Sequence, residues 1–121
     1  MNAIRIYLAG PMSGLPDFNY PAFNQAAERL RGLGFHVENP AECAPCGSWG
    51  EYMRRGITKM LTCDCVAFLP GSQAFKGATI ERRLAADLGI PECRVTALLI
   101  DTETVKTYFL LLKSSMSEEE I

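Results

Sequence analysis

Short apolar runs alternate along this chain with stretches in which apolar residues recur every three or four positions. The clearest run covers residues 4–9 and stops at Gly10 and Pro11, which predicts a buried strand that ends in a turn. The main runs are predominantly apolar and do not alternate with polar residues, as expected of parallel strands that are buried on both faces. Further strands are predicted at residues 35–38, 63–69 and 94–100.

Helical periodicity fills the intervals between these runs. Pro21 suits the first position of a helix over residues 21–33, where apolar residues recur on one side. Ser48 is placed to cap a second helix, because Glu51 follows three residues later, at the spacing of a capping box. A third helix is predicted over residues 78–88.

The C-terminal stretch has two interpretations. Tyr108, Phe109 and Leu112 recur at helical spacing, which favours a helix packed on the sheet or on a second subunit. Residues 108–112 taken alone are also consistent with an edge strand. An acidic tail is expected at about residues 114–121.

The alternation of strands and helices predicts parallel strands joined by crossover helices. The expected fold is an α/β three-layer sandwich with a Rossmann-like or flavodoxin-like parallel sheet of four to five strands, formed by one domain over residues 1–121. Such sheets bind ligands at the carboxyl ends of the strands, where the strand order reverses. We expect the loops after the first and third strands to lie there.

The composition of the chain mainly excludes classes of partner. The 121 residues are 48% hydrophobic, which suffices for a core without disulfides or metal. The net charge is −2 and Lys and Arg form no long basic stripe, so duplex nucleic acid is not an expected partner, although a small anionic ligand is possible. No apolar run approaches the roughly 20 residues that span a bilayer. No secretory signal is visible either, so we expect no membrane association and a cytoplasmic location.

The cysteines raise the question of a metal site. Cys43 and Cys46 have a spacing found in zinc sites, but Cys63 and Cys65 lie in a predicted strand, where cysteines usually serve as small core hydrophobes. Together with Cys93 they make an odd number, which favours free thiols in a chain without an export signal. We therefore expect no bound metal and no cofactor.

Two residues are the first candidates for chemistry. Glu81 lies near the start of the third predicted helix, where the helix dipole favours a charged carboxylate, and such a group can attack an electrophilic sugar carbon. Tyr7, in the first strand, could donate a hydrogen bond to that carboxylate or to a sugar oxygen. By spacing alone, an ordinary helix-start glutamate and a core tyrosine are the more frequent roles.

Asp64 is a third candidate, because an acid inside the apolar stretch of residues 61–69 is costly unless it faces a cleft or finds a partner. Glu81 and Asp64 could then divide the work of glycosyl transfer, one attacking and the other handling protons. The alternative is a strand-start residue that accepts hydrogen bonds from loop amides.

Other residues could contact a ligand. Gly10, Ser13 and Gly14 form a short polar turn that could present amides to an anion, although it matches neither the Walker loop nor the dinucleotide-binding glycine pattern. Trp49 and Phe75 lie near the expected cleft, where they could stack on a base or simply pack.

The chain carries, in this order, IYLAGP, MSGLPDFNYPAF, ENPAE, CDCVAFLPGS and KGATIERRLAADLGIP. This series resembles the nucleoside 2-deoxyribosyltransferase-like superfamily and, within it, the DUF4406 branch of phages and bacteria, over residues 4–91. The superfamily also contains deoxynucleoside 5′-monophosphate N-glycosidases. Its members have Rossmann-like sheets and usually form dimers or higher oligomers.

The resemblance implies roles for individual residues. Glu81 matches the nucleophile that forms a covalent sugar intermediate, Tyr7 the tyrosine that orients it, and Asp64 the aspartate that assists protonation or positioning of the base. The regions around the sugar and the 5′-phosphate match the loop at Gly10, Pro11, Ser13 and Gly14 and the turn at Gly77.

The chain also departs from the superfamily. Ser72 and Phe75 stand where a tryptophan and a phosphate-contacting serine are usual, which leaves 5′-phosphate recognition open, and Arg82 and Arg83 are possible substitutes. The leading hypothesis is an enzyme that acts on the N-glycosidic bond of a nucleoside or nucleotide, as hydrolase or transferase. The alternatives are a protein that binds a nucleotide or ADP-ribose-like ligand without turnover, and a flavin protein on a similar fold.

Overall fold

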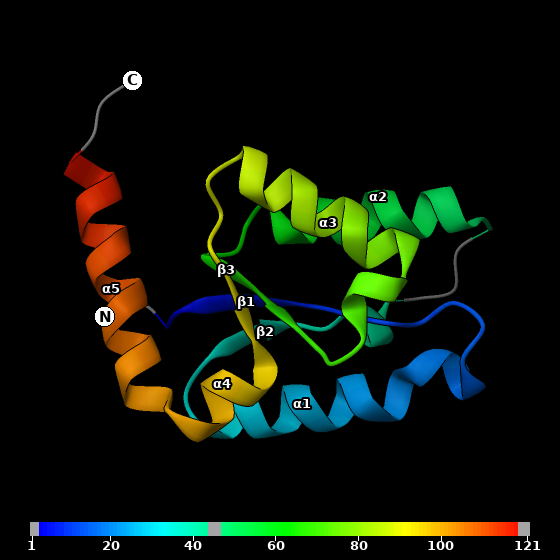
Figure 1. The fold of residues 1–121 in the computed structure, drawn as a ribbon, viewed down its shortest axis with the longest axis horizontal. Coiled ribbons are helices and arrows are strands. Elements are labelled where there is room, and N and C mark those ends of the chain that lie inside the picture. Colours follow the sequence, from blue (N-terminus) through cyan, green and yellow to red (C-terminus); the bar gives the residue numbers. More distant parts are fainter. Residues whose placement is uncertain (1–2, 44–46, 119–121) are drawn as a thin grey trace.

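The computed structural model describes residues 3–43 and 47–118 and contains one four-stranded sheet (Figure 1). All strand pairs are parallel, and the strand order is β2-β1-β3-β4. The chain therefore moves outward in one direction from β1 and in the other from β3. The strands are β1 (Arg5–Ala9), β2 (His36–Glu38), β3 (Cys65–Phe68) and β4 (Glu92–Arg94).

Helices cover both faces of the sheet, which confirms the predicted α/β sandwich (Figure 1). The cap predicted for the second helix is present, since the Ser48 hydroxyl accepts a hydrogen bond from the Glu51 amide at 3.1 Å. The helices are α1 (Tyr20–Gly32), α2 (Trp49–Met60), α3 (Lys76–Asp87), α4 (Val95–Ile100) and α5 (Thr102–Glu118), with short 3-10 turns at Pro16–Asn19, Pro40–Glu42 and Ser72–Ala74.

The side chains of successive residues of β1 point to opposite faces of the sheet and pack in two different hydrophobic cores. Ile6 and Leu8 point to the face covered by α1, α4 and α5, and both are fully buried there. Tyr7 and Ala9 point to the opposite face, under α2 and α3. This alternation follows from the strand period of two, and it places a tyrosine between two helices.

The fourth predicted strand is mostly wrong. The ladder ends at Arg94, and the residues that follow form the short helix α4, which buries Val95 and Leu98. A short apolar run does not distinguish a buried strand from a buried helix, because both are apolar. The Ala-Leu-Leu sequence within this run has high helix propensity.

The C-terminal stretch forms helix α5, as favoured, and not an edge strand. Its Phe109 is only 2% exposed and belongs to the core shared with α1 and α4. Residues 114–118, expected as part of an acidic tail, continue this helix, whereas residues 119–121 lie outside the described part. Of the helices in residues 3–43 and 47–118, none combines the length and hydropathy that a bilayer-crossing segment requires.

Phe109→Ala should lower the free energy of unfolding by about 3–5 kcal/mol, because it removes a buried aromatic ring and leaves a cavity. Tyr108→Ala is the matched control, since the neighbouring side chain is 55% exposed, and it should cost less than about 1 kcal/mol. Urea unfolding followed by circular dichroism measures both losses. Equal losses would show that α5 does not pack through Phe109.

Candidate functional site

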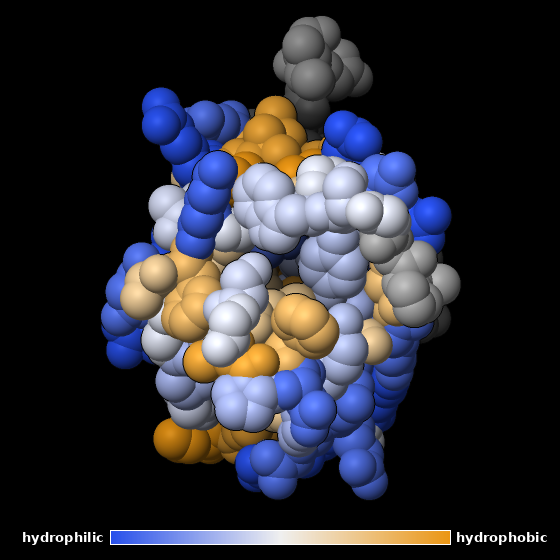
Figure 2. Space-filling view, turned by 90° about the vertical axis from the view of Figure 1, so that its right-hand side faces the viewer, coloured by the Kyte–Doolittle hydropathy of each residue, from blue (hydrophilic) through white to orange (hydrophobic). Residues whose placement is uncertain are grey.

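A cavity of about 1030 Å³ opens at the carboxyl edge of the sheet. Its walls come from residues that follow β1, β2 and β3, including Gly10, Pro40 and Phe75, and from the first turns of α2 and α3. This position lies at the reversal of strand order between β1 and β3, where open α/β sheets bind ligands. Figure 2 shows the hollow on this side of the molecule, bordered by apolar and weakly polar side chains.

Tyr7 and Glu81 meet in the wall of this cavity. The Tyr7 hydroxyl donates a hydrogen bond to Glu81 Oε2 at 2.5 Å, and the two side chains are 2% and 6% exposed. They are 74 positions apart in the chain, and they are brought together because β1 directs Tyr7 under α3, where Glu81 lies in the second turn. The predicted pairing of these two residues is therefore present.

Gly56 provides the space for this contact. It is buried in the middle of α2, and a Cβ atom built on it would lie 2.5 Å from the Tyr7 hydroxyl and 3.6 Å from Glu81 Oε2. Real Cβ atoms do not approach other atoms within 3.0 Å. Any larger residue would therefore displace the tyrosine or the helix.

Burial raises the pKa of Glu81 to about 7, although the hydrogen bond from Tyr7 acts in the opposite direction. The sequence led us to expect that the helix dipole would favour the charged form. Desolvation outweighs that effect, because Glu81 lies in the second turn of α3 and the helix dipole acts mainly within the first turn. Near neutral pH, the carboxyl group is therefore divided between its protonated and ionised forms.

Tyr7 remains the hydrogen-bond donor in this pair. Burial, and then the charge of Glu81, raise the pKa of its phenol well above the ordinary value. The phenol therefore keeps its proton at physiological pH and stabilises the ionised form of Glu81.

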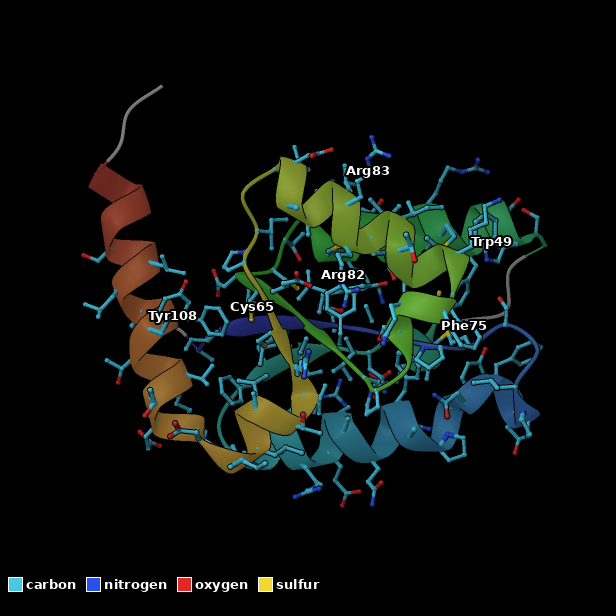
Figure 3. The ribbon with its side chains drawn as sticks, in the orientation of Figure 1. Trp49, Cys65, Phe75, Arg82, Arg83 and Tyr108 are labelled. Carbon is cyan, nitrogen blue, oxygen red and sulfur yellow. The ribbon has the colours of Figure 1, made fainter. Side chains whose placement is uncertain are left out.

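Aromatic side chains border the cavity near the starts of α2 and α3. Trp49 and Phe75 both line it, and Figure 3 shows them at the same end of the structure. The Lys76 ammonium lies 4.9 Å from the centroid of the Trp49 ring. Lys76 is the only cationic side chain among the described residues that line the cavity.

The predicted contact residues separate into two groups. Gly10, Ser13 and Gly77 line the cavity, as does Trp49, whereas Pro11 and Gly14 do not. Close packing explains two of the glycines. A Cβ atom on Gly10 would lie 2.8 Å from Leu69 Cβ, and one on Gly77 would lie 3.1 Å from Met53 Sδ.

Asp64 is not brought to this cavity, so its predicted place beside Glu81 is wrong. It lies just before β3, at the amino edge of the sheet, and its Oδ2 accepts a hydrogen bond from the Arg5 amide at 2.8 Å. The alternative role, a strand-start residue that binds a backbone amide, describes this contact. In the predicted strand over residues 63–69, Asp64 is the second residue, so the strand direction alone places it at the amino edge, away from the cavity.

Ser72, Arg82 and Arg83, which were considered because the chain departs from the superfamily in this region, do not form a phosphate site. Ser72 is buried, and its hydroxyl donates to the Leu69 carbonyl. Arg82 lies over the Phe68 ring at 4.3 Å and pairs with Glu92 at 2.9 Å, and Arg83 is exposed (Figure 3). Neither arginine lines the cavity.

Cys63 and Cys65 behave as core residues, whereas Cys43 and Cys93 are partly buried. Cys65 is fully buried, and burial raises the pKa of Cys63 to about 11, so neither has the character of a reactive thiolate. Cys46 lies outside the described residues, so the zinc-type spacing of Cys43 and Cys46 is not tested by the structure. Within the described ranges, no group of three or more His, Cys, Asp or Glu side chains is arranged to hold a metal ion.

Sequence reasoning missed Gly56 and Tyr52. The Tyr52 hydroxyl donates to the Pro40 carbonyl at 3.0 Å and lies 3.0 Å from Met12 Sδ, so α2 is tied to the loops that follow β1 and β2. The signal for Gly56 was available, because a glycine inside an amphipathic helix costs about 1 kcal/mol and usually has a packing reason.

Gly56→Ala should reduce stability by about 1–3 kcal/mol, because the added methyl group overpacks the site at the Tyr7 hydroxyl. Gly50→Ala is the control in the same helix. The atoms nearest to its new Cβ lie 3.9 Å away, so the higher helix propensity of alanine should leave stability unchanged or increased. Urea unfolding compares the two variants. A similar gain in the free energy of unfolding for both variants would contradict the close contact at Gly56.

The raised pKa of Glu81 makes stability depend on pH. Its value is about 7 in the folded protein against an ordinary 4.5, so the folded protein binds this proton more tightly than the unfolded chain. The resulting stabilisation is complete below about pH 4.5 and is lost as the pH rises through about 7. The expected loss is on the order of 3 kcal/mol.

Urea unfolding of the wild type and Glu81→Gln across this pH range measures the effect. The wild type should lose stability relative to Glu81→Gln as the pH rises. Tyr7→Phe should extend the loss to higher pH, because the hydrogen bond from Tyr7 lowers the pKa of Glu81. A constant difference between the wild type and Glu81→Gln would contradict the raised pKa.

Comparison with known families places this arrangement in a defined group. A family model described as a domain of unknown function, DUF4406, matches residues 4–93, which include Tyr7, Gly56 and Glu81. None of the curated proteins matches the chain at a significant level. The family match ends within β4, so α4 and α5 lie beyond it. Because it spans well over half of the 121 residues, the chain belongs to the DUF4406 family.

Proposed function

We propose that this protein is an enzyme that acts on the N-glycosidic bond of a nucleoside or nucleotide, with Glu81 as the nucleophile. The observation that carries this proposal is the buried hydrogen bond between Tyr7 and Glu81 in the wall of a large, mainly apolar cavity. A carboxylate of this kind is partly desolvated and held in one orientation, two conditions that favour attack on an electrophilic carbon.

In the proposed reaction, a Glu81 carboxylate oxygen forms a bond to C1′ of the sugar. The bond between C1′ and the base nitrogen breaks, and the base leaves with the bonding electrons and gains a proton. Water, or a second base, then attacks C1′ and releases Glu81. Both steps pass through an oxocarbenium-like transition state, which the negative charge of Glu81 stabilises.

The proton for the leaving base needs a source other than Asp64, which lies at the opposite edge of the sheet. Glu81 is the only carboxylate among the described residues that line the cavity. We therefore assign protonation of the base to solvent. Substrates whose bases leave readily without a strong acid should react best.

The similarity of the sequence to the nucleoside 2-deoxyribosyltransferase-like superfamily supports the same reaction. In that superfamily, a glutamate and a strand-one tyrosine have the roles that we propose for Glu81 and Tyr7. The 5′-phosphate contact is the weaker part of the likeness, because Ser72 is engaged with the backbone and Phe75 replaces the usual serine. The superfamily also implies a homodimer or higher oligomer, which we propose for this chain.

Release of free base from a panel of nucleosides and nucleoside 5′-monophosphates tests the proposal. Glu81→Gln should lower kcat by at least about 1,000-fold, as expected for loss of a nucleophile. Tyr7→Phe should lower it about tenfold, because it removes a hydrogen bond to a charged group. Glu28→Gln, which changes an exposed residue of α1, is the control and should retain activity.

The pH dependence provides a second readout of the same assay. Activity should rise with pH through about 7 as Glu81 ionises. In Tyr7→Phe the midpoint should move to higher pH. No released base from any substrate, combined with equal nucleotide binding by the wild type and Glu81→Gln, would contradict the proposed reaction.

A second function, binding of a nucleotide or ADP-ribose-like ligand without turnover, is favoured by one observation. Glycosyl-transfer sites usually contain two carboxylates, and only Glu81 is found among the described cavity residues. The cavity volume of about 1030 Å³ is also at the upper end for small-ligand sites. A tightly bound nucleotide recovered intact after long incubation would support this function over catalysis.

A further inference from the structure

Three consecutive residues before α1 have left-handed backbone conformations. Asp17, Phe18 and Asn19 have φ values of 50°, 51° and 60°, and they are the only described residues other than glycine with positive φ. Asparagine and aspartate tolerate this conformation, but a bulky residue such as phenylalanine rarely adopts it. We call these three residues the left-handed strap.

Local hydrogen bonds hold the left-handed strap in place. Asn19 Nδ2 donates to the Pro11 carbonyl at 2.9 Å, and the Phe18 amide donates to the Leu15 carbonyl at 2.9 Å. The Phe18 ring, however, is 56% exposed. Packing of this ring therefore contributes little to the strained conformation, and the ring can move without opening the core.

The Phe18 ring lies at the cavity. Phe18 and Tyr20 both line it, with ring centroids 5.8 Å apart. Trp49 borders the same cavity from the start of α2, a helix that covers the other face of the sheet, and is 45% exposed (Figure 1 and Figure 3). Two exposed aromatic rings thus border one cavity from opposite layers of the sandwich.

We propose that the left-handed strap is a lid that closes Phe18 over a planar aromatic ligand, whose other side faces Trp49. Aromatic rings stack on planar heterocycles with little dependence on the identity of the heterocycle. Closure buries a ring that is now exposed, and it releases the strap from its strained backbone. The lid belongs to ligand binding, and it operates whether or not the ligand is cleaved.

The backbone part of the proposal is tested by two matched pairs. Phe18→Gly should melt about 4 °C higher than Phe18→Ala, because only glycine adopts a positive φ without strain. Leu111→Gly and Leu111→Ala are the control pair at an exposed position of α5, where glycine should melt lower. A lower melting temperature for Phe18→Gly than for Phe18→Ala would overturn the left-handed assignment.

The lid itself is tested with anilinonaphthalene sulfonate, an aromatic dye that binds apolar cavities, followed by quenching of Trp49, the only tryptophan of the chain. Phe18→Ala should weaken binding about tenfold, Phe18→Tyr should restore it, and Leu111→Ala should leave it unchanged. Hydrogen exchange of the amides of residues 17–20 should slow severalfold when the dye is added.

Each opposite outcome overturns the proposal. Absence of dye binding would mean that the cavity does not accept an aromatic ligand. Unchanged binding by Phe18→Ala would exclude a contact with the ring. Weakened binding with unchanged amide exchange would identify Phe18 as part of a rigid wall. Because the dye is not cleaved, these results do not depend on the activity of Glu81.

Discussion

The hydrogen bond between Tyr7 and Glu81 is the contact on which the site depends, because it joins a strand and a helix at a point that water barely reaches. A buried carboxyl group is costly in its charged form, and the Tyr7 phenol offsets part of that cost. The contact requires a tyrosine on the correct face of β1, a glutamate in the second turn of α3, and the absence of a side chain at Gly56 of α2. The contact between the Tyr7 hydroxyl and Glu81 Oε2 thus restricts which residues can stand at these positions of β1, α2 and α3.

The parallel sheet gives this pair its surroundings. Because the strand order reverses between β1 and β3, the loops after these strands separate and leave a cavity, and the starts of α2 and α3 bring Trp49 and Lys76 to it. The cavity is rich in aromatic side chains and poor in charge, which suits a planar base better than a highly charged ligand. A carboxyl group that titrates near neutrality in such surroundings is a frequent property of reactive groups.

Much of this could be predicted from the sequence because the signals were local. The apolar run of β1, the Ser48 cap and the spacing of α5 each depend on neighbouring residues, and each was confirmed.

The prediction of the fourth strand was mostly wrong, because an apolar run of six or seven residues suits either a buried strand or a buried helix. The predicted place of Asp64 beside Glu81 was wrong for a different reason. Asp64 stands just before β3, and the start of a parallel strand lies at the amino edge of the sheet, whereas the cavity opens at the carboxyl edge. Gly56 carried a signal, as a glycine inside an amphipathic helix, but the sequence does not name the residues that it contacts, which lie 49 and 25 positions away.

The most direct measurement is a crystal structure of Glu81→Gln, which should not turn over, with a nucleoside 5′-monophosphate bound. The sugar should lie over the pair of Tyr7 and residue 81, with C1′ within about 3.5 Å of the side-chain amide oxygen or nitrogen at position 81 and the base among the aromatic residues. This prediction would be contradicted by a ligand whose phosphate occupies the position next to residue 81, or by one that binds outside the cavity.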